Sequence, residues 1–212
     1  MSAASQRYWD ANAAAYAFGH PVEWSWLAAL PKDARILDYG CGYGRLVAEL
    51  TDAGWRSVVG VDFAAAMIER GLREHPGLDL RHATGLPLAE PDAAFDAALL
   101  FAVLTSIPDD AEQRALMAEL RRLIRPGGLL YLSDLPLQTD QRHLDRYAAG
   151  LARHGVYGVW DRDDGGVFRH HPRERLDALM EGFELAAERE IEVRSLSGVP
   201  MIALQRLGRR VA

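Results

Sequence analysis

The chain has 212 residues, 49% of them hydrophobic, which is enough for one domain with a substantial core and argues against a disordered class. Its 30 acidic and 24 basic residues leave a net charge of −6, which disfavours nucleic acids and anionic membrane surfaces as partners. A single cysteine cannot form an internal disulfide, and the opening MSAASQRYWDANAAAYA lacks the apolar run of a secretory signal, so we expect a cytoplasmic protein.

Short β-rich runs alternate with segments of helical spacing along most of the chain. The expected strands are Arg35–Asp38, Ser57–Asp62, Leu78–His82, Phe95–Phe101 and Leu129–Asp134. Apolar residues at helical spacing lie between them, at Leu46, Val47, Leu50, Met67, Ile68, Leu72, Leu116, Leu120, Leu123 and Ile124. Pro126-Gly127-Gly128 is expected to end the third helix, and Asp109 or Asp110 to cap its start. This alternation predicts an α/β fold with a parallel sheet and helices on both faces.

The end of the chain has a different pattern. Two strand-like runs, Phe183–Arg194 and Val199–Leu207, are separated only by residues 195–198, which leave no room for a helix. They predict a hairpin whose last strand runs antiparallel to the others. Residues 135–171 interrupt the alternation and are interpreted as a cap or insertion over the carboxyl edge of the sheet.

A glycine-rich loop follows the first expected strand in ILDYGCGYGRL (residues 36–46). A dinucleotide loop requires its third glycine where Arg45 stands, and a triphosphate loop requires a Gly-Lys-Ser/Thr ending that is absent. Asp38, just before the glycines, would repel a pyrophosphate but suits an ammonium group. S-adenosylmethionine carries an ammonium, a sulfonium and a carboxylate but no phosphate, so the loop predicts this cofactor.

A second carboxylate supports the same ligand. The hydroxyl groups of a ribose require an acidic residue at the end of the next strand, about 20 residues further on. The run VVGVDF places Asp62 at that position. Two acids at consecutive strand ends, with one glycine loop between them, are far more specific than the loop alone.

With these motifs, the chain resembles the class I S-adenosylmethionine-dependent methyltransferases. ILDYGCGYGRL and VVGVDFAAAMIERG resemble the first two motifs of that family, and RHATGLPLAEPDAAFDAALL and LIRPGGLLYLSD resemble the segments that lead to the fourth and fifth strands. The resemblance covers about Arg35–Asp134. It implies a Rossmann-like, seven-stranded, mostly parallel sheet in a single domain (1–212), with its antiparallel strand in the C-terminal hairpin and a helical lead-in at 1–30.

The resemblance also implies a set of cofactor-binding residues, including an aromatic residue of the lead-in that closes over the cofactor. They are Tyr16, Asp38, Gly40, Cys41, Gly42, Gly44, Asp62, Phe63, Met67, Ala83, Thr84 and Phe101. One position departs from the family, because His82 stands where an acid commonly faces the adenine amino group. We expect backbone groups of Ala83 to serve the adenine instead.

The acceptor site is expected in the cap. VWDRDDGGVFRHH predicts a hairpin with a DDGG turn, which places Arg169 and His171 on one face and His170 on the other. His170 is the first candidate for a catalytic base, with His154 and His143 behind it, and Tyr157, Trp160 and Arg169 are candidates for binding the acceptor. His171 could also act as a base, but it precedes Pro172 and a helical pattern and is therefore also consistent with a residue that only starts a helix. No cluster of ligands at recognisable spacing predicts a metal site.

The predicted function is transfer of a methyl group from S-adenosylmethionine to an O or N atom of a small organic molecule by a monomeric or homodimeric enzyme. A methyltransferase for peptide or protein side chains is the alternative, and an open acidic groove would favour it. A non-catalytic, cofactor-binding scaffold and a nicotinamide-dependent oxidoreductase are two further possibilities. An enclosed space beside the methyl group would argue against a scaffold, and binding of NAD without S-adenosylmethionine would indicate an oxidoreductase.

Overall fold

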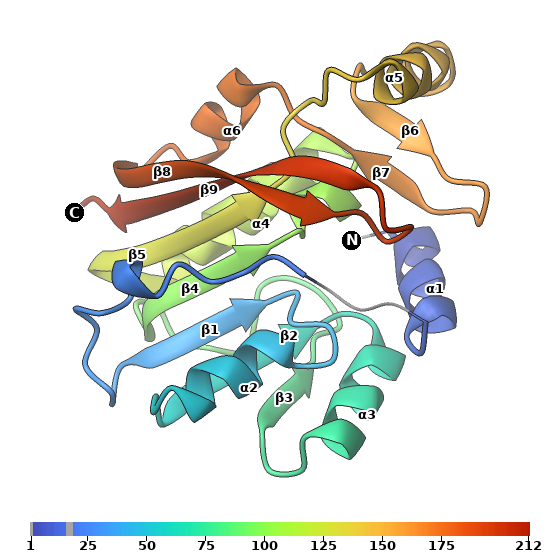
Figure 1. Cartoon of the computed structure of the whole chain (residues 1–212). Coiled ribbons are helices and arrows are strands. Elements are labelled where there is room, and N and C mark those ends of the chain that lie inside the picture. Colours follow the sequence, from blue (N-terminus) through green and yellow to red (C-terminus); the bar gives the residue numbers. More distant parts are fainter. Residues whose placement is uncertain (1, 16–18) are drawn as a thin grey trace.

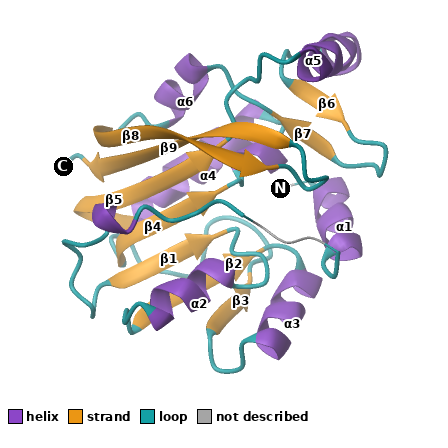
Figure 2. Ribbon diagram, viewed as in Figure 1, coloured by secondary structure: helices purple, strands orange, loops and turns teal. Residues whose placement is uncertain are grey.

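The computed structural model describes residues 2–15 and 19–212, so the expected cofactor residue Tyr16 lies outside the described part. There the chain forms a seven-stranded sheet and a separate two-stranded sheet, with helices packed around them (Figures 1 and 2). The strands of the large sheet are β1 (Arg35–Tyr39), β2 (Ser57–Asp62), β3 (Asp79–His82), β4 (Phe95–Phe101), β5 (Ile124–Asp134), β8 (Phe183–Arg194) and β9 (Pro200–Arg210). The small sheet consists of β6 (Val159–Asp161) and β7 (Val167–Arg169). The helices are α1 (Ala3–Asn12), η1 (Trp24–Trp26), α2 (Arg45–Asp52), α3 (Ala65–Glu74), η2 (Leu104–Ser106), α4 (Asp110–Leu123), α5 (Gln141–His154) and α6 (Arg173–Leu179).

The order of strands in the large sheet is β3-β2-β1-β4-β5-β9-β8. Strands β1 to β5 pair in parallel, whereas β9 pairs antiparallel with both β5 and β8. The structure therefore confirms the predicted mostly parallel sheet and its antiparallel hairpin strand. Because β8 runs in the same direction as β5, the β8–β9 turn lies at the carboxyl edge of the parallel strands.

Both faces of the sheet are buried, and strand β4 shows why its residues are apolar throughout. Ala98 and Leu100 of this strand belong to the core that α4 and α6 cover, and Ala97 and Leu99 to the core that α2 covers. Successive residues of a strand point to opposite faces, so a strand covered on both sides needs apolar residues at every position. Figure 1 shows α2 and α3 in front of the sheet and α4 behind it.

The two ends of α4 test the expected cap and the expected stop. The Asp109 side chain accepts hydrogen bonds from the N–H groups of the first turn, as an N-cap does, and confirms the predicted start. Helix α4 ends at Leu123, just before Pro126-Gly127-Gly128, as the expected stop predicts, but β5 begins at Ile124 and not at the expected Leu129. Ile124 is fully buried and pairs with Phe95, so the chain enters the sheet before the Pro-Gly-Gly sequence.

Residues 135–171 contain α5 and the β6–β7 hairpin. The hairpin pairs Val159 with Arg169, as VWDRDDGGVFRHH predicts. A Cβ atom on Gly150 of α5 would lie 1.8 Å from the carbonyl oxygen of Val159, so the helix touches β6 backbone to backbone. Helix α1 lies beside the hairpin (Figure 1), with the Tyr8 and Phe168 ring centroids 5.8 Å apart. Across residues 2–15 and 19–212, no helix combines the length and apolar character needed to span a membrane.

Candidate active site

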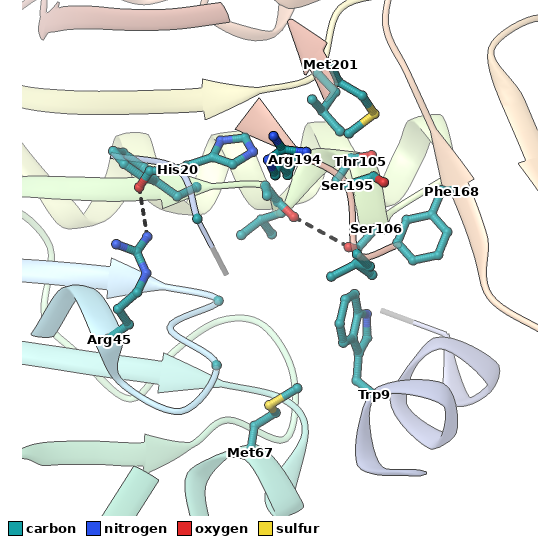
Figure 3. A pocket seen from close by; sticks show the side chains of 18 of the residues that line it. Trp9, His20, Arg45, Met67, Thr105, Ser106, Phe168, Arg194, Ser195 and Met201 are labelled. Atoms are coloured by element: carbon teal, nitrogen blue, oxygen red, sulfur yellow. Dashed lines mark hydrogen bonds between the residues drawn. The ribbon is translucent and has the colours of Figure 1, made fainter. Parts of the chain in front are cut away.

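A cavity of about 140 Å³ lies at the carboxyl edge of the parallel strands, with walls from strand ends, α1, α5, β7 and the β8–β9 turn (Figure 3). The structure brings eleven of the residues predicted for cofactor, catalysis or acceptor to this cavity. They are Asp38, Gly40, Cys41, Gly42, Asp62, Phe63, Met67, Phe101, His143, Trp160 and His170. Segments that are remote in sequence therefore line one cavity.

The glycine loop between β1 and α2 needs glycine for two physical reasons. Gly40 has φ +75°, and a Cβ atom there would lie 2.4 Å from Cγ2 of Val103. Gly44 has φ +83°, and its Cβ would lie 2.8 Å from a methyl group of Leu80. Gly44 does not line the cavity; it begins α2 and allows close packing on β3. The N–H of Gly40 donates to the Val61 carbonyl at 2.8 Å, which holds the loop against β2.

Asp38 carries an uncompensated carboxylate. It is 1% exposed, and its Oδ2 atom has no hydrogen-bond partner among the described residues. Burial raises the pKa of Asp38 to about 7, although the nearby positive charge of Arg45 opposes the rise. Arg45 itself donates to Glu49 and to the carbonyl oxygen of His20. A buried carboxylate without a partner is costly unless a cationic or hydrogen-bonding ligand meets it, so this residue fits the ammonium group of the expected cofactor.

Asp62 holds the loop and faces the cavity at the same time. Its Oδ2 accepts the N–H of Gly42 at 2.9 Å, and its Oδ1 accepts the N–H of Ala64 at 2.8 Å. Burial raises the pKa of Asp62 to about 6, and hydrogen bonds from the N–H groups of Ala64, Gly42 and Phe63 limit the rise. An ionised carboxylate offers about four acceptor positions, so it keeps capacity for a ribose hydroxyl group.

A second cavity of about 200 Å³ lies beyond Phe63, which lines both spaces. The predicted residues Ala83 and Thr84 line this second cavity. The N–H of Ala83 donates to the Asp62 carbonyl at 2.8 Å, so the group that Ala83 offers an adenine is its carbonyl oxygen. The His82 ring bonds to the Phe63 carbonyl at 3.1 Å, which holds its side chain against this loop.

Two residues predicted to bind the acceptor line neither cavity. Tyr157 is 41% exposed and packs edge-on against Tyr147. Arg169 is buried, and its guanidinium donates to Asp110 at 2.6 Å and to the Pro108 carbonyl at 2.9 Å. Arg169 therefore ties β7 to the start of α4. His170 follows Arg169 and points the opposite way, so it lines the cavity.

Several cavity residues were not predicted as site residues. They are Trp9, His20, Thr105, Ser106, Phe168, Arg194, Ser195 and Met201, all of which Figure 3 labels. The predicted topology contained one indication of these residues. A C-terminal hairpin beside the parallel sheet brings its turn to the carboxyl edge of the strands, and Ser195 lies in that turn. The resemblance implied an aromatic residue of the lead-in at this site but assigned it to Tyr16, and the structure brings Trp9 of α1 to the cavity.

The cap contributes two histidines to the cavity, His143 from α5 and His170 just after β7. His143 bonds through Nδ1 to Oδ2 of Asp140 at 2.5 Å, and His170 bonds through Nδ1 to the Tyr147 hydroxyl at 2.6 Å. Burial lowers the pKa of His170 to about 3, and its proximity to His143 adds to this effect. His170 is therefore neutral at pH 7. Among the described residues, no three potential ligands gather that could hold a metal ion.

Comparisons with known proteins agree with this geometry. A family model described as "Methyltransferase domain" matches residues 14–190. A probable S-adenosylmethionine-dependent methyltransferase of Mycolicibacterium smegmatis is 29% identical over 130 residues, which cover 61% of this chain and 46% of that protein. The chain thus spans about half the length of the curated relatives it matches.

Solved structures share the fold. The crystal structure of an S-adenosylmethionine-dependent methyltransferase from Methanosarcina mazei matches with a TM-score of 0.82 and 24% identity, covering 92% of this chain and 99% of that one. A Burkholderia thailandensis 1,6-didemethyltoxoflavin-N1-methyltransferase, bound to 1,6-didemethyltoxoflavin and S-adenosylhomocysteine, matches with a TM-score of 0.63 and 21% identity, covering 98% and 79% of the two chains.

Proposed function

Because this chain belongs to the class I S-adenosylmethionine-dependent methyltransferases, we propose that it transfers the methyl group of S-adenosyl-L-methionine to an O or N atom of a small organic molecule. The Burkholderia neighbour, with a small heterocycle and S-adenosylhomocysteine bound, is a precedent for such an acceptor on this fold. We further propose that the enzyme is cytoplasmic, acts as a monomer or homodimer, and has neither a nucleic acid nor a membrane as partner.

The observation that carries this proposal is the buried carboxyl of Asp38 at the cavity wall, whose Oδ2 atom has no hydrogen-bond partner among the described residues. It matches the ammonium group of the cofactor, and Asp62 matches the ribose. The bound cofactor supplies a methyl group activated by a positively charged sulfur. The protein positions the acceptor behind that methyl group and excludes water, and such positioning contributes about 7–11 kcal/mol.

The shape of the cavity favours a small acceptor over a peptide or protein side chain. The β6–β7 hairpin, α1 and the β8–β9 turn contribute Phe168, Trp9 and Ser195 to its walls, so three elements bound the acceptor space. A protein substrate would need an open groove that admits the neighbouring backbone. A cavity with aromatic walls beside the cofactor residues also favours an enzyme over a non-catalytic scaffold.

Calorimetry and a transfer assay test the proposal together. We expect the purified protein to bind S-adenosylmethionine and S-adenosylhomocysteine but not NAD. With methyl-labelled cofactor, we expect label to pass to members of phenol, amine or carboxylate libraries. Binding of NAD alone would contradict the family activity, and label passing only to peptides would contradict the acceptor class.

The affinity for the cofactor should depend on pH through Asp38. Burial raises the pKa of this carboxyl to about 7, so it is increasingly protonated, and neutral, below pH 7. The amino group of the cofactor stays charged in this range. The ammonium group binds the ionised form of Asp38, so at lower pH a proton must leave this carboxyl before the cofactor binds. The affinity for the cofactor should therefore fall by about tenfold when the pH is lowered from 7 to 5.5.

Calorimetric titration with S-adenosylhomocysteine over this pH range provides the measurement. Proton release on binding, detected by comparing buffers of different ionisation enthalpy, should increase as the pH falls. Asp38→Asn should bind more weakly at pH 7 and lose most of the dependence. A wild-type affinity that stays constant from pH 7 to 5.5 would contradict the ammonium role.

A further inference from the structure

Two histidines face the same cavity from different elements of the cap. The rings of His143 and His170 lie 5.4 Å apart between centroids, and both side chains are buried. Each uses its Nδ1 atom in a hydrogen bond with a protein group, and neither Nε2 atom has a protein hydrogen bond among the described residues. What each Nε2 can do depends on the proton carried by the other ring nitrogen.

His170 presents an N–H donor to the cavity. Burial raises the pKa of Tyr147 well above its usual value, so this hydroxyl keeps its proton. The same hydroxyl accepts the N–H of Gln138 at 3.0 Å, and His170 Nδ1 is the acceptor that remains for its hydrogen among the described residues. The neutral ring of His170 therefore accepts at Nδ1 and carries its hydrogen at Nε2. A nitrogen that carries this hydrogen cannot accept a proton from a substrate.

His143 has the opposite arrangement. Partial burial of Asp140 tends to raise its pKa, but hydrogen bonds from His143 hold that pKa below its usual value. Asp140 is therefore an ionised acceptor at pH 7. His143 must then donate from Nδ1. In its neutral form its Nε2 atom keeps a lone pair, and a carboxylate behind Nδ1 is the usual device for orienting and strengthening such a base.

Resting on the proposed methyl transfer, we infer that His143, oriented by Asp140, is the general base of this site and that its acceptor is the hydroxyl group of an aromatic compound. His170 donates from Nε2 to the same oxygen. The hydroxyl oxygen has two lone pairs, one for the incoming methyl carbon and one for His170. An aromatic amine has one lone pair, which the methyl carbon takes, so it leaves His170 without an acceptor.

The walls of the cavity suit a flat ring. Trp160 and Phe168 of the hairpin lie 5.7 Å apart between centroids, and Trp9 lines the cavity from α1. In the transfer, the O–H bond of the phenol breaks and its proton passes to Nε2 of His143. The oxygen forms a bond to the methyl carbon, and the electrons of the broken carbon–sulfur bond stay on sulfur. His143 then returns its proton to water.

The charged and titratable groups around His143 come from the cap. Asp140 and Arg146 lie on its own helix, with the Arg146 guanidinium 4.4 Å from the Trp160 ring centroid. His170 faces it from the end of β7, with the two ring centroids 5.4 Å apart. Burial lowers the pKa of His170 to about 3, so this neighbour is neutral near pH 7.

Asp140 also serves a structural purpose, since its Oδ1 caps α5 by accepting the His143 N–H at 3.2 Å. Asp140→Asn separates the two roles. Asparagine caps a helix as well as aspartate does, but its amide N–H₂ faces the ring and donates to Nδ1. The variant should fold normally and hold His143 with its hydrogen at Nε2. In that form Nε2 has no free lone pair and cannot accept a proton from the acceptor.

Two experiments test the inference, and the first needs no acceptor. Nitrogen-15 NMR of histidine-labelled protein with S-adenosylhomocysteine should find hydrogen at Nδ1 of His143 and at Nε2 of His170. In Asp140→Asn, the hydrogen of His143 should be at Nε2 instead. The second uses labelled cofactor with phenol, catechol and 4-hydroxybenzoate as probes, each beside the matching aniline. His143→Gln and Asp140→Asn should lower kcat by about 100-fold or more.

The matched control lies on the same helix. His154 bonds to Asp161 at 2.9 Å but does not line the cavity, so His154→Gln should leave kcat unchanged. Cofactor affinity should be equal in all variants.

Several outcomes would overturn the inference. These are hydrogen at Nε2 of His143 in the wild type, wild-type kcat in His143→Gln, and methylation of the anilines alone. Intact cofactor binding without turnover of any phenol probe would also overturn it. Failure of the wild-type protein to bind S-adenosylmethionine would instead contradict the proposed function.

Discussion

Replacing Asp62 with alanine is expected to weaken cofactor binding by about 1–3 kcal/mol, roughly 5- to 150-fold, and to destabilise the protein as well. The binding loss comes from the charge-assisted hydrogen bonds proposed between this carboxylate and the ribose. The destabilisation comes from the buried N–H groups of Gly42 and Ala64, which lose their acceptor. Each unsatisfied group costs about 1–3 kcal/mol, so the free energy of unfolding should fall by roughly 2–6 kcal/mol.

Calorimetry with S-adenosylhomocysteine and urea unfolding measure the two effects separately. The control is Asp79→Ala, an exposed aspartate on the neighbouring strand whose partner is Arg81. A surface pair of this kind contributes about 0–1 kcal/mol, so the control should bind the cofactor normally and lose little stability. If Asp62→Ala were destabilised but bound the cofactor with wild-type affinity, the carboxylate would serve the loop and not the ribose.

Replacing Gly150 with alanine is expected to disrupt the cap. An exposed helical glycine changed to alanine gains about 1 kcal/mol of stability. Here the added Cβ would meet the Val159 carbonyl oxygen at 1.8 Å, and a backbone carbonyl in a hairpin cannot rotate away as a side chain can. We therefore expect the opposite sign, a loss of about 1–3 kcal/mol or more in the free energy of unfolding.

The loss should be confined to the acceptor side of the site. Helix α5 carries His143, and the adjacent hairpin carries Trp160, so separating the two opens the acceptor wall. Asp38 lies at the end of β1, remote in sequence from the cap, so cofactor affinity should be retained. Hydrogen exchange should increase in residues 155–171 and not in β1. Exposed Ala149→Gly is the control, with a loss of about 1 kcal/mol and a normal cap; a Gly150→Ala variant more stable than the wild type would refute the packing argument.

The cofactor half of the site follows from local sequence. Asp38 and Asp62 each end a strand of the parallel sheet, and the carboxyl ends of parallel strands meet at one edge. The fold class, the strand ends and the glycine loop could therefore be predicted without coordinates. The start of β5 could not, because the burial of Ile124 against β4 outweighed the Pro-Gly-Gly signal.

The acceptor half depends on contacts between segments far apart in the chain. Trp9, Thr105, His143, His170 and Ser195 meet only because helices and hairpins pack over one sheet edge. The sequence ranked His170 first as a base, and nothing in its spacing distinguishes it from His143. That distinction lies in hydrogen bonds, since a tyrosine hydroxyl donates to one ring and a carboxylate accepts from the other. The sequence by itself determined the fold class and indicated where a cofactor is expected, because those signals are periodic and local. Only the tertiary structure decided which histidines line the cavity and that Tyr147 meets His170, because these contacts depend on how α5, the β6–β7 hairpin and the edge of the sheet pack together.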